Sequence, residues 1–124
     1  MLASSEMVGF VPTRDSKQAR DFYEKKLGFQ FVCDDSFALV MRAGKSTIRI
    51  AKVHDFKPDV FTILGWKVKD IEVVVKWLKG RGVAFEEYPF IQEPKVGIWT
   101  SPSGAKVAWF KDPDGNVLSV SQHE

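Results

Sequence analysis

The most closely spaced oxygen-bearing side chains of this sequence lie in Asp112-Pro113-Asp114-Gly115-Asn116. Carboxylate and amide oxygens at alternate positions could open a calcium loop, because Ca²⁺ takes oxygen ligands. Such a loop also needs further acidic positions and a closing glutamate, which the following residues do not supply. Proline, aspartate, glycine and asparagine are the residues that tight turns need. We therefore predict a turn between two strands here and no calcium site.

Other side chains that could do chemistry are few and scattered. Cys33 lies in an apolar-polar run typical of a strand, so we predict a packed thiol and not a nucleophile. Ser101 and Ser103 lie in an expected turn without a paired histidine, which gives a serine nucleophile little support. His54 and His123 are the two histidines. Both lie outside the predicted strand cores, and we expect both side chains to be solvated.

The composition predicts one compact domain over residues 1–124. With 44% hydrophobic and 27% charged residues, the chain can bury a core without a disulfide or structural metal. The net charge of +2 and the dispersed Lys and Arg residues disfavour a nucleic-acid partner. A single cysteine excludes an intramolecular disulfide, and no stretch has the length of a membrane span or the pattern of an export signal. We expect a cytoplasmic protein without a membrane partner.

The elements that must position these residues occur twice along the chain. An apolar strand pattern precedes Asp15 at the spacing at which a similar pattern precedes Asp70, and each aspartate is placed to cap a helix. The helices are expected at 16–26 and 71–79, the latter with Val74, Trp77 and Leu78 inward. Strands are expected at 7–12, 29–33, 37–42 and 47–52, and again near 61–68, 84–88, 105–110 and 117–121. Two βαβββ modules, about 7–53 and 61–121, are therefore predicted, with a linker at 54–59.

Several aromatic residues are candidates for the core or for a ligand site. We expect Phe22, Trp66 and Trp77 to pack each helix on its sheet. Trp99, Trp109 and Phe110 stay open, because an insertion at 91–103 is expected to add a hairpin around residues 97–99. That insertion could fold as a lid over a ligand or against a partner subunit.

A sheet with one helix leaves its other face uncovered, and two such modules side by side would curl into a half-barrel with a concave cleft. The paired βαβββ pattern, Ala19-Arg20-Asp21-Phe22-Tyr23, Leu27-Gly28-Phe29 and the segment 109–116 together resemble the vicinal oxygen chelate superfamily. That superfamily includes glyoxalase I, fosfomycin resistance transferases, extradiol dioxygenases and bleomycin resistance proteins. The resemblance covers roughly residues 7–121 and implies a homodimer with this α+β half-barrel fold. It leaves the function open, because one scaffold hosts many chemistries.

The resemblance also implies positions for metal ligands. Metal-dependent members take one ligand from the first and one from the last strand of each module, usually His, Glu or Gln, and the ion acts as a Lewis acid on vicinal substrate oxygens. None of the corresponding side chains offers an imidazole or carboxylate, and a guanidinium would repel a cation. These positions fall on Val8, Arg49, Ile63 and Ser119. We expect no cofactor, with a divalent metal on atypical ligands such as His123 and Glu124 as the alternative.

Strand alternation predicts a mostly apolar cleft with one or two cations and some hydroxyl groups. Arg49 could hold an anionic or carbonyl group of a partly hydrophobic ligand, or it could pair with a carboxylate such as Asp34, Asp35 or Glu86. The predicted ligand-binding residues are Val8, Phe10, Arg49, Ile63, Lys67, Trp99, Ser119 and Ser121.

These patterns favour a metal-independent small-molecule binding protein of the glyoxalase/bleomycin resistance type. A glyoxalase-like lyase or isomerase, or a dioxygenase with atypical metal ligands, is one alternative, and we can name no catalytic residue for it. A protein-interaction module without a small ligand is the other. The sequence identifies neither the ligand nor whether the cleft forms within one chain or across a dimer.

Overall fold

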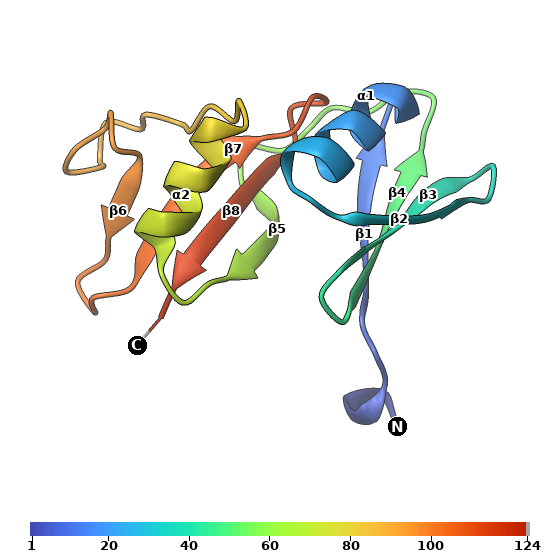
Figure 1. The fold of residues 1–124 in the computed structure, drawn as a ribbon, viewed down its shortest axis with the longest axis horizontal. Coiled ribbons are helices and arrows are strands. Elements are labelled where there is room, and N and C mark those ends of the chain that lie inside the picture. Colours follow the sequence, from blue (N-terminus) through green and yellow to red (C-terminus); the bar gives the residue numbers. More distant parts are fainter. Residues whose placement is uncertain (124) are drawn as a thin grey trace. The chain divides into compact units, whose positions relative to one another are not determined.

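The computed structural model describes residues 1–123, and the strands of this part of the chain form two four-stranded sheets (Figure 1). One sheet belongs to a compact unit over Met1–Lys57, and the other belongs to a second unit that begins at Pro58. Each unit contains a strand, a helix and three further strands in chain order. The predicted α+β fold with two βαβββ modules is confirmed. No helix among the described residues combines the length and hydrophobicity needed to span a membrane.

The first unit has its last strand beside its first. Its elements are a short 3₁₀ helix (Leu2–Ser4), β1 (Val8–Thr13), α1 (Ser16–Arg20), a π-helical segment (Asp21–Lys26), β2 (Gln30–Asp34), β3 (Ala38–Ala43) and β4 (Ser46–Lys52). The strand order is β1-β4-β3-β2, in which β1 and β4 are parallel and the other neighbours are antiparallel. A parallel pair needs a long crossover connection, and the helix lies within that crossover.

The helix of the first unit begins and ends where its sequence predicts. The Asp15 carboxylate accepts hydrogen bonds from the backbone N–H groups of Lys17 and Gln18, both at 3.1 Å. These bonds satisfy donors that a helix start leaves without partners. Gly28 follows the last turn with φ of 80°, a left-handed conformation that favours glycine. Phe22 is buried, which confirms its predicted place in the core.

Cys33 departs from the prediction of a packed thiol, because its side chain is exposed. It lies on β2, which is the outer strand of the first sheet. The β2–β3 register shifts between Phe31 and Cys33, so the ladder is irregular at this point. An edge strand with a bulge has fewer neighbours to cover its side chains.

The second unit repeats the arrangement of the first. Its elements are β5 (Thr62–Lys67), α2 (Ile71–Gly80), β6 (Ile98–Thr100), β7 (Lys106–Lys111) and β8 (Val117–Gln122). The strand order is β5-β8-β7-β6, and β5 and β8 are parallel. In Figure 1, α2 crosses one face of this sheet and leaves the opposite face without a helix.

Helix α2 packs on the sheet through residues spaced at helical intervals. Ile71, Val75 and Leu78 are buried and form one stripe along it. Trp77 was expected in this core, but 47% of its surface is exposed, so that prediction is wrong. Its position lies about 100° around the helix from Leu78, outside the stripe. The Arg81 guanidinium instead lies 4.5 Å from the Trp77 ring centroid. Val74, also expected inward, is partly exposed.

The predicted strand at 84–88 is wrong, because only Phe85 makes a bridge there, to Phe110 of β7. The backbone N–H of Glu86 donates to the Trp109 carbonyl at 2.8 Å, and regular pairing stops. Pro89 follows shortly and cannot donate to a ladder. The rest of the outer edge of β7 pairs with β6, the hairpin strand expected around residues 97–99.

The turn at 112–116 is confirmed, and its aspartate organises it. Asp112 Oδ1 accepts from the backbone N–H groups of Asp114 at 3.0 Å and Asn116 at 2.9 Å. The Asn116 side chain donates to Asp112 Oδ2 at 2.9 Å. Gly115 has φ of 90°, which favours glycine. The oxygen atoms that suggested a calcium loop therefore serve the turn that joins β7 to β8.

Candidate functional site

Three predicted ligand-binding residues share one face of the first sheet. Ile48 and Ile50 of β4 are buried, while Arg49 between them is only partly buried, so Arg49 points to the face opposite α1. We call this surface the first open face. Phe10 lies beside Arg49 in the parallel register and Val8 lies two residues before it, so both side chains point to the same face. Val8 and Phe10 are exposed hydrophobic residues.

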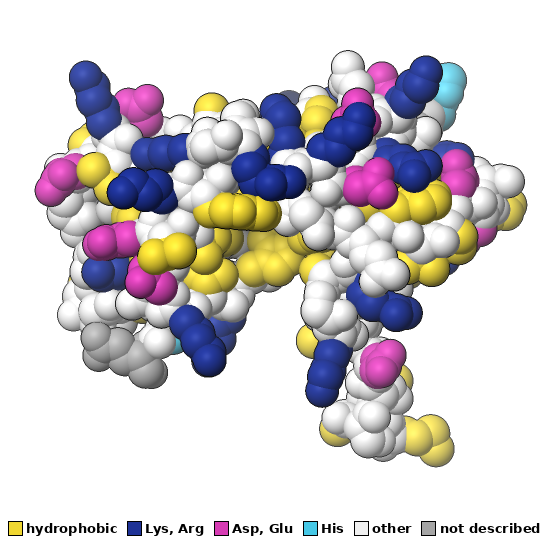
Figure 2. All heavy atoms as spheres, in the orientation of Figure 1, with side chains coloured by type: hydrophobic (Ala, Val, Ile, Leu, Met, Phe, Trp, Pro, Cys, Tyr) yellow, Lys and Arg dark blue, Asp and Glu magenta, His cyan; other side chains and the backbone are white. Residues whose placement is uncertain are grey.

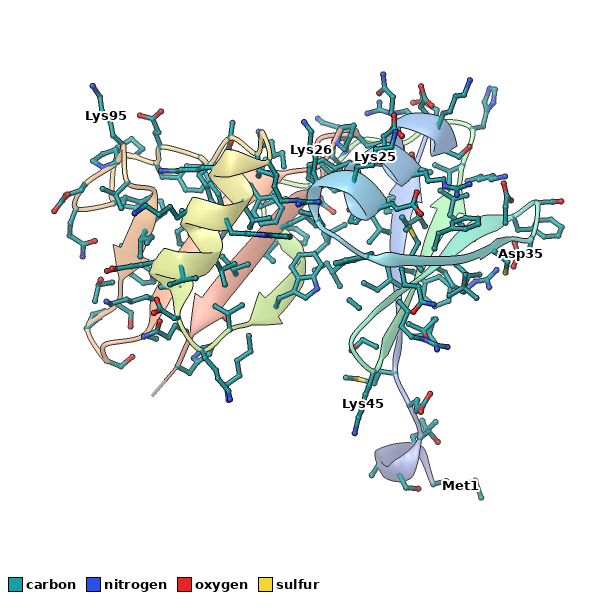
Figure 3. All side chains as sticks on the ribbon, viewed as in Figure 1. Met1, Lys25, Lys26, Asp35, Lys45 and Lys95 are labelled. Atoms are coloured by element: carbon teal, nitrogen blue, oxygen red, sulfur yellow. The ribbon has the colours of Figure 1, made fainter. Side chains whose placement is uncertain are left out.

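Arg49 on the first open face is paired with Asp35, one of the carboxylates considered for it. Its Nη2 lies 2.6 Å from Asp35 Oδ2. Asp35 lies at the turn between β2 and β3 (Figure 3), and its other oxygen accepts from the backbone N–H groups of Phe37 and Ala38. The bond from Arg49, followed by that from the Ala38 backbone, holds the pKa of Asp35 below its ordinary value. The pair leaves other Arg49 N–H donors available to a ligand oxygen.

Four of the remaining predicted residues share the face of the second sheet opposite α2, which we call the second open face. Leu118 and Val120 of β8 are buried on the α2 side, so the alternating Ser119 and Ser121 point to the other side. Lys67 pairs with Ser121 across β5 and β8. Val107 pairs with both Ser121 and Trp99, so Trp99 lies on the same face. Ile63 lies in the register shift between Thr62 and Leu64 and is partly buried.

Gly65 and Ser119 lie side by side on the second open face. A Cβ atom at Gly65 would lie 2.9 Å from Ser119 Oγ and 3.3 Å from the Ser119 carbonyl oxygen. The 2.9 Å distance is shorter than real Cβ contacts and the 3.3 Å distance is tighter than most of them, so the Ser119 hydroxyl occupies space that a side chain at position 65 would take. The absence of a side chain at Gly65 therefore leaves room for this hydroxyl.

Four aromatic rings gather on the second open face. We define the aromatic cluster as Tyr88, Phe90, Trp99 and Trp109. The centroids of the two tryptophan rings are 6.1 Å apart, and Phe90 meets both edge-on, at 6.1 Å and 5.7 Å. Tyr88 stacks on Phe90 at 5.3 Å. Such distances are typical of favourable aromatic pairs.

The aromatic cluster is incompletely covered, and sequence reasoning found only part of it. Phe90 is exposed over 58% of its surface, and the other three rings are partly exposed. Of the four, Trp99 was predicted as a ligand residue and Trp109 was left open. Tyr88 and Phe90 lie in the segment mistaken for a strand and its connection, which gave no signal for their position.

Tyr88 and its neighbours add polar groups to the aromatic cluster. Burial, assisted by the negative charge of Glu86, raises the pKa of the Tyr88 phenol above its ordinary value. The phenol is therefore protonated at neutral pH and can donate a hydrogen bond. Lys111 Nζ lies 3.4 Å from Glu86 Oε1.

The positions implied for metal ligands have unsuitable neighbours in this structure. Arg49 pairs with Phe10 and Ser119 pairs with Gly65 on the neighbouring strands. These cross-strand neighbours also offer no imidazole or carboxylate. His54 is exposed. His123 is exposed, with Nε2 3.0 Å from Ser121 Oγ, and Glu124 lies outside the described residues. Within residues 1–123, no group of three or more His, Cys, Asp or Glu side chains is arranged to hold a metal ion.

Residues 7–120 match the family model described as the Glyoxalase/Bleomycin resistance protein/Dioxygenase superfamily. The chain belongs to this superfamily. A comparison with curated proteins found no match. Solved structures with the same fold align with nearly the whole chain of this superfamily member. A glyoxalase/bleomycin resistance protein/dioxygenase from Alicyclobacillus acidocaldarius has a TM-score of 0.77 at 18% identity, covering 97% of this chain and 92% of its own.

Two further similar structures carry functional descriptions. TnmS3, an antibiotic binding protein from Streptomyces sp. CB03234, has a TM-score of 0.74 at 23% identity and covers 100% of this chain and 99% of its own. A lactoylglutathione lyase from Agrobacterium tumefaciens has a TM-score of 0.71 at 18% identity, covering 96% of this chain and 93% of its own. At these identities the likeness shows a shared fold and does not choose between binding and catalysis.

Proposed function

We propose that this superfamily member is a small-molecule binding protein whose ligand lies against the aromatic cluster on the second open face. The partial exposure of all four rings is the observation that supports this proposal most strongly. Aromatic side chains contribute large contact areas, and ligand sites combine such surfaces with a few polar groups. A planar, partly hydrophobic ligand could place one ring face or edge against the cluster.

The polar groups around the aromatic cluster suggest how the ligand would be oriented. Trp109 is in register with Ser119, and Ser121 and Lys67 lie further along the same face. Hydroxyl groups and a lysine ammonium can donate to a carbonyl or carboxylate oxygen of the ligand. Within the first unit, we propose that Arg49 on the first open face can hold a ligand oxygen in the same way, with apolar contact from Val8 and Phe10. Within the second unit, we propose that Ile63 supplies apolar contact.

Binding without a metal is part of the proposal. The residues at and beside the implied ligand positions lack metal-binding groups, which argues against the Lewis-acid chemistry of the metal-dependent members. The description of TnmS3 as an antibiotic binding protein is consistent with a binding function on this fold. We also propose that the protein forms a homodimer in the cytoplasm, since exposed sheet edges favour pairing.

A fluorescence titration with planar aromatic carboxylates, beginning with 2-naphthoate, would test the site. Trp99→Ala should weaken binding by about tenfold, because an aromatic contact contributes roughly 0.5–1.5 kcal/mol beyond its buried area. Trp77→Ala is the matched control, since Trp77 is an exposed tryptophan on α2 outside the aromatic cluster. Equal losses in the two variants would contradict the proposed site.

Metal independence needs a separate measurement. Protein purified without chelator should contain no stoichiometric metal, and nickel, zinc, manganese or iron should leave the unfolding midpoint unchanged, because only a bound ion stabilises the folded state by mass action. A midpoint raised by one specific ion would overturn this part of the proposal. It would direct attention to the metal-dependent lyase or dioxygenase alternative.

A further inference from the structure

A groove with a volume of about 880 Å³ lies in the second unit, away from the aromatic cluster. It is lined by α2, by the segment 92–96 and by three residues of the β6–β7 hairpin, Ile98, Thr100 and Lys106. Ile98 and Thr100 flank Trp99 on β6, and Lys106 precedes Val107 on β7. Successive side chains of a strand point to opposite faces, so these three side chains point away from the face of Trp99 and Val107. The groove and the aromatic cluster therefore lie on opposite sides of one sheet.

The α2 wall of the groove is one face of the helix. The lining residues of α2 are Glu72, Val73, Val75, Lys76 and Lys79. Spacings of three, four and seven residues place these side chains along one side of a helix. Figure 2 views the molecule from the α2 side and shows basic, acidic and hydrophobic side chains next to one another on the second unit. The helix thus presents a mixed apolar and charged surface to the groove.

The wall opposite α2 is held in place by two side chains. Lys79 Nζ donates to the carbonyl oxygens of Lys95 at 3.2 Å and Val96 at 3.1 Å. The Gln92 amide donates to the Thr100 carbonyl at 2.9 Å and accepts from the Thr100 backbone N–H at 3.2 Å. Segment 91–97 is thereby tied to α2 and to the edge of β6, on the α2 side. Of the two alternatives left open for the insertion at 91–103, a lid or a contact with a partner subunit, segment 91–97 forms no lid over the second open face within the second unit.

The lining combines aliphatic side chains with an excess of lysine over glutamate. The apolar lining residues are Val73, Val75, Val96 and Ile98, and none is aromatic. The charged lining residues are Lys76, Lys79, Lys95 and Lys106, with Glu72 and Glu93. Lys106 Nζ lies 3.9 Å from Glu72 Oε1, whereas no carboxylate among residues 1–123 forms an ion pair with Lys76 or Lys95. Lys95 projects from the chain at this end of the unit (Figure 3).

We propose that this groove is a second binding site, for a small organic anion with an aliphatic body. The apolar part would lie against the valines and Ile98, and the anionic group would lie near Lys76 and Lys95. The excess of lysine over glutamate disfavours a cation, and the absence of rings in the lining distinguishes this ligand from the planar ligand proposed for the aromatic cluster. The volume lies within the range of small-molecule sites.

Octanoate is a suitable probe, with octyltrimethylammonium as the matched cation, both well below micelle-forming concentrations. Titration into ¹⁵N-labelled protein should shift amide signals of residues 72–79 and 92–100 with octanoate and not with the cation. Lys76→Glu and Lys95→Glu should each weaken octanoate binding by about two- to fivefold, the scale of one exposed charge pair. Lys45→Glu, a reversal in the β3–β4 turn of the first unit (Figure 3), should leave the affinity unchanged.

Four outcomes would overturn the inference: no saturable octanoate binding, shifts confined to the second open face, equal affinity for the cation, or equal loss in all three lysine variants. Preference for an acidic peptide over octanoate would also overturn it. Trp99→Ala keeps this test separate from the proposed function, because Trp99 lies on the other side of the sheet and its loss should leave octanoate binding unchanged.

Discussion

Arg49 Nη2 and Asp35 Oδ2 lie 2.6 Å apart, so the Arg49 guanidinium on the first open face is held by a carboxylate from the β2–β3 turn. Asp35 also orders that turn through its other oxygen, which accepts from two backbone N–H groups. Asp35→Asn removes the charge and can keep the amide oxygen as an acceptor. The substitution therefore separates the ion pair from the geometry of the turn.

We expect Asp35→Asn to lower the unfolding midpoint slightly at pH 7 and to have no effect in strong acid. The folded-state pKa of Asp35 is depressed, so its stabilising contribution is complete above the unfolded-state pKa and is lost as pH falls through the folded value. The difference between variant and parent should thus begin to shrink near about pH 4, the ordinary pKa of aspartate, and should disappear only below the depressed folded-state pKa. Thermal unfolding across pH 2–8 would check it, and a difference that persists in acid would refute the assignment.

Gly65→Ala should destabilise the protein by about 1–3 kcal/mol, the range for an overpacked site. The new Cβ would meet Ser119 Oγ at 2.9 Å and force that hydroxyl to move. Adding Ser119→Gly should recover part of the loss, although the 3.3 Å approach to the Ser119 carbonyl remains. Gly80→Ala is the control, because nothing lies within 4 Å of its Cβ position and alanine favours the helix end. Denaturant unfolding of all four proteins tests this coupling.

Gln92→Ala should destabilise the β6 edge by about 0.5–1.5 kcal/mol, the net contribution of a typical hydrogen bond. The Gln92 amide satisfies both the N–H and the carbonyl of Thr100, as a neighbouring strand would. Hydrogen exchange at Thr100 should accelerate in the variant, while Gln30→Ala on β2 should leave that exchange unchanged. Unaltered protection of Thr100 would mean that the amide does not shield this edge.

Glu86→Gln should lower the pKa of the Tyr88 phenol toward its ordinary value without reaching it. The negative charge of Glu86 disfavours the phenolate, but burial is the larger cause of the raised pKa and would remain. Absorbance titration of the phenolate measures the change, and Tyr88→Phe identifies the signal, since the chain has two tyrosines. A pKa that stays unchanged would show that Glu86 has no electrostatic influence on the aromatic cluster.

Much of the fold could be predicted because its signals are local. Asp15 and Asp70 precede apolar helical patterns and cap both helices, and the spacing of aspartate, glycine and asparagine at 112–116 specifies a turn. The alternation of Ile48, Arg49 and Ile50 predicted which side of β4 would be buried. Each of these inferences depends on residues a few positions apart.

The errors arose where distant segments decide the outcome. Trp77 is a large apolar residue and was therefore expected in the core. It is exposed because the buried stripe of α2 runs through Ile71, Val75 and Leu78. Segment 84–88 has the composition of a strand, yet β6 occupies the first half of the β7 edge, and segment 84–88 makes only the Phe85–Phe110 bridge with the rest. The aromatic cluster depends on the same pairing, because Trp99 reaches Phe90 and Trp109 from β6, which pairs with β7. Tertiary pairing of this kind overrides local propensity.

The place of β8 inside the second sheet has a consequence for how this unit is made. β8 lies between β5 and β7, so the last of the four strands of this sheet in chain order is an inner strand. β5 has no parallel neighbour until β8 has emerged, and the Gln122 side chain that accepts from the Ile71 N–H at 2.8 Å arrives later still. In the first unit, by contrast, β4 closes the sheet by Lys52. The sheet of the second unit can therefore be completed only after β8 has been synthesised, whereas the sheet of the first unit can be completed while the second unit is still being translated.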